Sequence, residues 1–142
     1  MAPIDRRFML ALLAAVPMVC MAGEAEDAQA AVERIRRSIS DQNFERLYDD
    51  QTSEFFKAGI RRAEFLQNMK QGRAQVGATK SINAMSHSYS EIDPQTGYRG
   101  KIYAFDFLVK YDKGAFFERL VLVKDPDGRY RLAGIRANPA PN

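Results

Sequence analysis

Apolar residues recur at helical spacing over the first half of the chain after position 23. Between Glu24 and Ile39 they fall on one stripe with charged residues opposite, which predicts an amphipathic helix. A second stripe predicts a helix from Phe44 to Phe55, with Ser40 to Asn43 supplying side-chain oxygens to cap it. A third segment, Ile60 to Val76, stops at Gly77, a residue suited to the left-handed turn after a helix. Three helices are therefore expected before any strand.

After Gly77 the period changes from helical to alternating. Three turn signals divide this half into four strands, because each supplies Asp, Pro or Gly residues that accept turn geometry. The turns are Asp93 to Gly97, Asp112 to Gly114 and Asp125 to Gly128. The predicted strands are Thr79 to Ile92, Tyr98 to Tyr111, Ala115 to Lys124 and Arg129 to Ala137. Such short connections make neighbouring strands antiparallel.

The second and third predicted strands differ in their faces. In the second, one face is aromatic, and we expect it to receive the helices; it carries Tyr103, Phe105, Phe107, Val109 and Tyr111. In the third strand both faces are apolar, which suits a central strand or one whose outer face meets a partner. Helices followed by an antiparallel meander predict an α+β domain in which a curved four-stranded sheet wraps around the N-terminal helices.

The first 22 residues have the pattern of a secretory signal peptide. A charged head, Asp5 to Arg7, precedes an apolar run from Phe8 to Val19, and small residues follow up to Gly23. The run is too short for the roughly 20 residues of a stable membrane span. We therefore predict a leader over residues 1–22, one domain over 23–137 and a flexible tail over 138–142. The mature chain is expected in the periplasm or secreted, without stable membrane insertion.

Two features of the leader leave its processing open. Arg6 and Arg7 before apolar residues resemble the twin-arginine export signal, although arginine pairs also occur in ordinary signals. Cys20 raises lipid attachment as an alternative, but Val19 occupies the place where a lipoprotein signal has a small residue. Cleavage after Ala22 is the favoured interpretation.

Removal of the leader changes the composition. It removes Asp5, Arg6 and Arg7, so that 19 of the 21 basic and 17 of the 18 acidic residues remain, a net charge of about +2. Near-balanced charge argues against a nucleic-acid partner, which needs a clustered basic surface. The local basic patch at Arg34, Arg36 and Arg37 is interpreted as a solvated helix face. With the one cysteine gone and one histidine left, neither a metal site nor a cofactor is expected.

Spaced aromatic and glycine residues resemble those of small exported bacterial families of unknown function. The run Asp41 to Tyr48, then Phe55 to Lys57, and the closing run Gly128 to Ile135 carry the resemblance, with Tyr130 where such families usually have tryptophan. These families are similar to the nuclear transport factor two-like, or cystatin-like, superfamily. The resemblance implies a cone-shaped cavity between sheet and helices, and homodimerisation through the outer sheet face.

Some relatives in that superfamily are similar to ketosteroid isomerase or polyketide cyclases, which use a carboxylate base and a donor such as tyrosine. The candidate catalytic residues here are Glu118, Asp106, Tyr103 and His87. Glu118 alternates with inward-facing residues and is the best carboxylate candidate, against the alternative of a cross-strand ion pair. Asp106 is expected to be exposed or paired with Arg119 or Arg131. The favoured interpretation of His87 is a strand-surface histidine, and that of Tyr103 is a core aromatic.

No hydrolase, zinc-protease or nucleotide-binding motif occurs in the chain. The leading hypothesis is therefore a non-enzymatic exported domain that binds a partner protein or a small apolar ligand through its cavity or sheet face. One alternative is an isomerase- or cyclase-like enzyme with Glu118 or Asp106 as base and a tyrosine as donor. The other is an inhibitor or immunity-like protein that docks on another exported protein.

Overall fold

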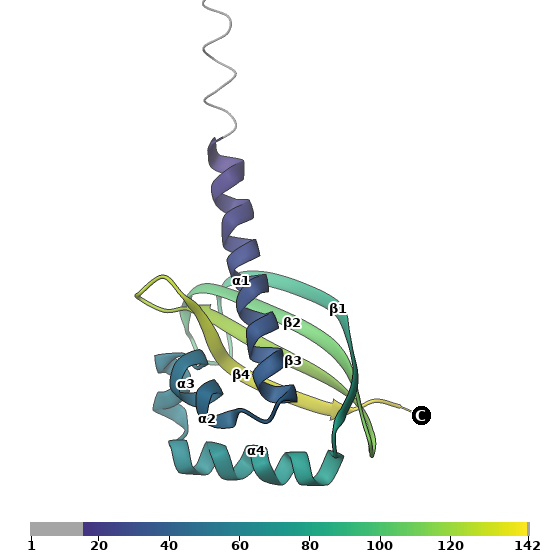
Figure 1. Ribbon diagram of the computed structural model, residues 1–142. Coiled ribbons are helices and arrows are strands. Elements are labelled where there is room, and N and C mark those ends of the chain that lie inside the picture. Colours follow the sequence, from purple (N-terminus) through teal and green to yellow (C-terminus); the bar gives the residue numbers. More distant parts are fainter. Residues whose placement is uncertain (1–15, 142) are drawn as a thin grey trace, which may run out of the picture.

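Residues 16–141 are described by the computed structural model, in which a helical layer lies in the hollow of one curved sheet (Figure 1). The helical elements are α1 (Val16–Ser40), α2 (Phe44–Arg46), the π-helical turn η2 (Leu47–Gln51), α3 (Glu54–Gly59) and α4 (Arg62–Val76). The strands are β1 (Thr79–Ile92), β2 (Arg99–Tyr111), β3 (Gly114–Lys124) and β4 (Tyr130–Pro139), antiparallel in the order β1-β2-β3-β4. The predicted α+β architecture is confirmed.

The core forms where the inner stripe of the sheet meets α1. The side chains that β2 turns inward are the predicted aromatic stripe, with Val109 fully buried and Tyr111 half-buried. From α1, Val32 and Ile35 pack against them, and β3 adds Leu120 and Leu122. Alternation along β2 and β3 therefore predicted the correct face, because a two-residue period places every second side chain on one side of a sheet.

The predicted second helix is wrong in its extent. The chain leaves the helical conformation at Thr52, whose ψ of 144° is extended and which pairs with Leu132 of β4. Ser53 then caps the new helix α3 by accepting a hydrogen bond from the Phe56 amide at 3.1 Å. Phe55 is consequently 43% exposed and packs against Tyr98 instead of continuing the core stripe. Asn43, at the N-terminus of α2 and among the residues expected to cap the predicted second helix, makes no side-chain capping bond.

Gly77 ends α4 as predicted, with a φ of 80°. A Cβ at this position would lie 2.7 Å from Cβ of Asp112, so steric space as well as backbone angle requires glycine. Asp112 also accepts a hydrogen bond from the Ala78 amide at 2.8 Å, which fixes the connection from α4 into β1.

The two ends of the described chain differ from the predicted boundaries. β4 continues through Pro139, and Asn138 pairs with Phe117, so the predicted tail begins two residues too early. At the other end α1 includes residues 16–22 of the predicted leader, and the rest of the leader lies outside the described residues. No helix within residues 16–141 has the length and apolar character needed to cross a membrane.

Glu24 of α1 is hydrogen-bonded to three strands of the sheet. Its carboxylate accepts hydrogen bonds from Lys101 at 2.8 Å, from Lys124 at 2.6 Å and from the Tyr130 hydroxyl. These donors, Lys101 first, lower the pKa of Glu24 from 4.5 to about 2. Tyr130 is buried against Tyr103, so this network joins α1 to β2, β3 and β4.

Candidate functional site

Glu118 lies inside the fold, at the centre of a buried polar cluster. Its Oε2 accepts a hydrogen bond from Arg36 of α1 at 2.5 Å, and its Oε1 accepts one from the Tyr111 hydroxyl at 2.5 Å. The Arg36 and Glu118 side chains are 5% and 9% exposed. We call these three residues the Glu118 cluster. The inward orientation predicted for Glu118 is confirmed, but its ion-pair partner comes from a helix and not from a neighbouring strand.

Tyr111 acts as the hydrogen-bond donor of the cluster. Burial, followed by the hydrogen bond to the carboxylate of Glu118, raises the pKa of Tyr111 from 10.0 to about 12. The phenol therefore stays protonated at neutral pH and donates its O–H to Glu118. The donor and the carboxylate of the cluster thus face each other.

Arg36 is the member of the cluster that the sequence interpretation missed. It was assigned to a solvated basic face with Arg34 and Arg37, yet it is buried and its guanidinium lies 5.2 Å from the centre of the Phe107 ring. Position 36 is four residues after Val32 and so belongs to the same helical stripe, which is the signal that would have placed it inside. Its Nε and Nη2 have no hydrogen-bond partner among the described residues, so Glu118 is its one charge partner there.

An apolar pocket of about 190 Å³ lies next to the cluster, between α4 and the adjoining ends of β2, β3 and β4. Glu118 and Tyr111 form the polar part of its wall, together with Asn68 and Arg73. We call it the α4 pocket; its other lining residues are Ile39, Phe44, Met69, Gly72, Val76, Phe116, Ile135 and Ala137. It is small beside the roughly 300–1,000 Å³ usual for ligand sites.

Arg73 closes one side of the α4 pocket. Its guanidinium donates to the carbonyl oxygens of Ile39 and Ser40 at the end of α1 and lies 5.8 Å from the centre of the Tyr111 ring. A cation beside the last carbonyls of a helix is favourable because those groups carry the negative end of the helix dipole. Arg73 therefore joins α1 to α4 and keeps the Tyr111 ring in place.

The remaining candidates do not join Glu118. Asp106 lies on the outer face, where Arg119 donates to it at 2.7 and 2.9 Å and Ser86 donates at 2.9 Å. The hydrogen bonds from Arg119 are the main reason that the pKa of Asp106 is lowered. His87 is exposed on β1, with its ring 6.1 Å from that of Phe105. Tyr103 pairs with Leu122, four positions along β3 from Glu118, and packs in the core.

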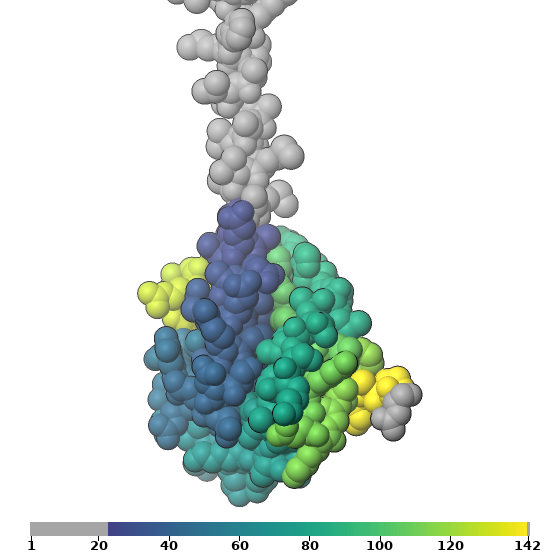
Figure 2. All heavy atoms as spheres, turned by 45° about the vertical axis from the view of Figure 1, so that its right-hand side comes forward, coloured from purple at the N-terminus to yellow at the C-terminus, as the bar shows by residue number. Residues whose placement is uncertain are grey.

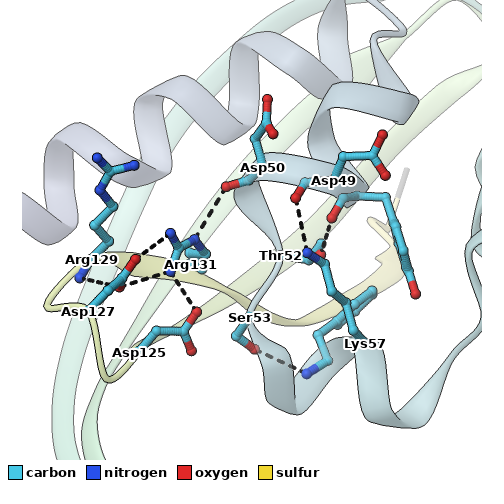
Figure 3. Close-up of polar contacts among 11 residues, drawn as sticks. Asp49, Asp50, Thr52, Ser53, Lys57, Asp125, Asp127, Arg129 and Arg131 are labelled. Carbon is cyan, nitrogen blue, oxygen red and sulfur yellow. Dashed lines mark hydrogen bonds and ion pairs between the residues drawn. The ribbon is translucent and has the colours of Figure 1, made fainter.

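A larger and more polar cleft of about 670 Å³ lies between α1, η2 and the β3–β4 turn (Figure 3). Arg131 crosses it, donating to Asp125 at 2.9 Å, to Asp127 at 2.7 Å and to the carbonyl of Asp50 at 3.3 Å. The hydrogen bond from Arg131 lowers the pKa of Asp127 to about 2. Asp49 is held in the same way by Arg62 at 2.9 and 3.1 Å. Through the Asp50 carbonyl, Arg131 connects the β3–β4 turn to η2, and the Asp49–Arg62 pair connects η2 to α4, so both have a structural role.

Within residues 16–141 no group of three or more His, Cys, Asp or Glu side chains is arranged to hold a metal ion. Glu118 is paired with Arg36, and in the cleft Asp125 and Asp127 are paired with Arg131. The cleft wall is mainly polar, whereas the α4 pocket combines apolar surface with the Glu118 carboxylate and the Tyr111 hydroxyl, the arrangement best suited to a small apolar ligand.

A protein-family model described as "Protein of unknown function (DUF4019)" matches residues 30–135. The chain belongs to this family. The match extends from α1 into β4 and so includes Arg36, Tyr111 and Glu118. It confirms the resemblance to a family of unknown function drawn from the sequence.

A solved structure from Catenulispora acidiphila is similar in fold, with a TM-score of 0.60 and 18% sequence identity. The similarity covers 84% of this chain and 94% of that chain. At this identity it supports the fold alone, which is compatible with the nuclear transport factor two-like architecture. A search of curated proteins found no significant match.

Proposed function

We propose that the chain is an exported, non-enzymatic domain that binds a small apolar molecule in the α4 pocket. The observation that carries this proposal is the pairing of an apolar pocket with the fixed carboxylate and hydroxyl of Glu118 and Tyr111 in its wall. A carboxylate offers about four lone-pair positions, and two of those on Glu118 are used. A ligand with one O–H or N–H donor on a ring or a short alkyl chain fits this chemistry.

The isomerase-like alternative is the weaker proposal because of how the same groups are arranged. A catalytic base and donor must flank the substrate, whereas Tyr111 donates directly to Glu118. Glu118 is also paired with Arg36, and Asp106 is paired with Arg119 on the other side of the sheet. The inhibitor or immunity-like alternative needs an exposed docking surface instead, and β1 offers one.

The proposed compartment depends on residues 1–22. Glu24, two residues after the predicted cleavage site, is hydrogen-bonded to the sheet, so a mature chain that starts at Gly23 would keep this connection. Expression of the full chain, followed by cell fractionation and intact mass measurement, tests export. We expect a periplasmic product whose mass corresponds to residues 23–142. An uncleaved product in the cytoplasm would refute export without bearing on the pocket.

Ligand binding is tested with 4-methylphenol, an apolar ring with a single O–H donor. We expect saturable amide shifts at α4 and β3 in ¹H–¹⁵N spectra, with a dissociation constant of about 0.1–1 mM for so small a ligand.

The blocking variant is Gly72→Leu. Gly72 lines the pocket, and a Cβ added there meets no atom within 4 Å, so the new side chain has room to cover the pocket without displacing its neighbours. Gly59→Leu is the matched control, because Gly59 also has open space but lies in α3, outside the pocket. We expect Gly72→Leu to lose binding and Gly59→Leu to keep it. Equal binding by both variants, or no saturable shift in the parent protein, would refute the pocket.

A further inference from the structure

Strand β1 is the part of the sheet that the helices leave bare. It forms one edge of the sheet, at the side away from α3 in Figure 1, and nearly all of its residues are exposed. Of the six large apolar side chains that are exposed among the described residues, four belong to this strand: Ile82, Met85, Tyr89 and Ile92. Figure 2 shows the strand on the surface beside α1. Exposed apolar groups gathered on one element mark an interaction surface.

The middle of β1 also lacks two of the features that usually prevent strand pairing, proline and charged side chains. Natural edge strands are protected by proline or by charged side chains, especially lysine. Between Ser81 and Ser90 there is no Pro, Asp, Glu, Lys or Arg. The two charged residues of the strand lie near its ends, Lys80 at one and Glu91 at the other.

The pattern along β1 is symmetric about the point between Met85 and Ser86. The register with β2 shifts three times, and on β1 the unpaired residues are Lys80, Met85 and Glu91; at the last shift Gly100 and Lys101 of β2 are unpaired as well. The inward-facing residues on one side of the central shift are Ile82 and Ala84, and on the other side they are His87 and Tyr89. The central irregularity shifts the in–out alternation of the side chains by one residue. A two-fold rotation about the point between Met85 and Ser86 therefore places Ile82 on Tyr89 and Ala84 on His87, and all four of these residues face inward.

We propose that β1 pairs antiparallel with β1 of a second copy of this chain, about a two-fold axis perpendicular to the sheet between Met85 and Ser86. In this register Lys80 lies opposite Glu91 of the other copy, Ile82 opposite Tyr89 and Asn83 opposite Ser88, each pair occurring twice. The result is a continuous eight-stranded sheet with both helical layers on one side. This interface differs from the outer sheet face implied by the family resemblance.

A second copy of this chain fits β1 better than an unrelated protein does, because the charges and the inward-facing side chains of β1 are self-complementary. A two-fold interface brings the same patch together twice, so opposite charges must lie at equal distances on the two sides of the axis. Lys80 and Glu91 meet this condition, and Ile82 and Tyr89 place an aliphatic group opposite an aromatic ring on the inner face. The bare strand separates the helical layers of the two copies.

Cysteine cross-linking tests the register directly. In a chain that starts at Gly23, which has no cysteine of its own, Asn83→Cys and Ser88→Cys are introduced together. Directly opposite residues have Cα atoms about 4.5–5.5 Å apart, within the disulfide range. Within one copy the two positions are five residues apart, about 16 Å, too far to join. We expect covalent dimers from the double variant and at least tenfold fewer from either single variant.

Charge reversal gives a second, reversible readout by sedimentation equilibrium. We expect Lys80→Glu to raise the dimer dissociation constant about tenfold, because it places two like-charged pairs in the interface. The combination Lys80→Glu with Glu91→Lys should restore it. Thermal unfolding of each variant shows whether the fold itself is retained, since Lys80 also pairs with Asp112 at 3.0 Å.

Three outcomes would overturn the proposal. They are a monomer at 100 µM, a dimer that neither cross-links in this register nor responds to Lys80→Glu, and a foreign protein bound at β1 of a monomer. None of them bears on 4-methylphenol binding in the α4 pocket, so the two proposals fail separately.

Discussion

Adjacent residues of β3 build two carboxylate–arginine pairs on opposite faces of the same sheet. Glu118 points inward to Arg36, and both side chains are at least nine-tenths buried. Arg119 points outward to Asp106, and these side chains are 51% and 30% exposed. The chemical groups are the same, but water solvates one pair and is excluded from the other. The comparison teaches that the position of a pair, and not its presence, decides how much the fold depends on it.

The largest expected effect is that of Glu118→Ala. It leaves the Arg36 cation buried without its charge partner, and we expect the free energy of unfolding to fall by about 3–5 kcal/mol in urea denaturation. The double variant Arg36→Met with Glu118→Leu should recover most of this loss, because an apolar pair carries no uncompensated charge. A loss below about 1 kcal/mol for Glu118→Ala would show that the buried pair contributes no more to stability than the exposed Asp106–Arg119 pair.

Tyr111→Phe is expected to have an intermediate effect, because it removes one hydrogen bond to a charged group, worth about 1.5–3 kcal/mol. The pH dependence of stability gives a second test of this buried hydrogen bond. The pKa of Tyr111 rises from 10.0 to about 12 on folding, so its contribution is complete below pH 10 and is lost as the pH climbs towards 12. The melting temperature of the parent protein should therefore fall more steeply than that of Tyr111→Phe across this range. Parallel curves would contradict the buried hydrogen bond.

The smallest effect is expected for Asp106→Ala on the outer face. Exposed pairs contribute about 0–1 kcal/mol, because water already solvates both groups. The pKa of Asp106 is lowered in the folded protein, so its contribution is present above the ordinary value of 3.8 and disappears as the pH falls below it. Urea denaturation of the parent and the Asp106→Ala variant at pH 7 and pH 3 measures the stability change and its pH dependence. Addition of 0.5 M NaCl should reduce the difference between the two proteins at pH 7. A loss that rivals that of Glu118→Ala would show that the outer pair is not solvated.

Residues whose position follows from a local period were predicted correctly. The two-residue alternation of β2 and β3 placed Glu118 inside, and it put Asp106 on the outer face with Arg119 as one of two named partners. The alternation could not decide whether Arg119 or Arg131 pairs with Asp106, because the partner depends on the register between neighbouring strands. Arg131 instead holds Asp125 and Asp127 at the β3–β4 turn.

Residues whose position depends on distant segments were predicted poorly. The helix break at Thr52 depends on Leu132, which is 80 positions away in the chain, and the helical period alone gives no sign of it. The buried state of Arg36 depends on Glu118, 82 positions away. An arginine is normally solvated, and composition alone therefore placed it outside.

The sequence by itself determined the order of helices and strands, the turns and the inner face of the sheet, since each depends on steric preferences and periods of a few residues. The tertiary structure alone decided which charges meet in the interior, how large the α4 pocket is and which strand the helices leave uncovered. These properties depend on the packing of whole elements, where the cost of burying a charge or an apolar surface is settled by neighbours far away in the chain.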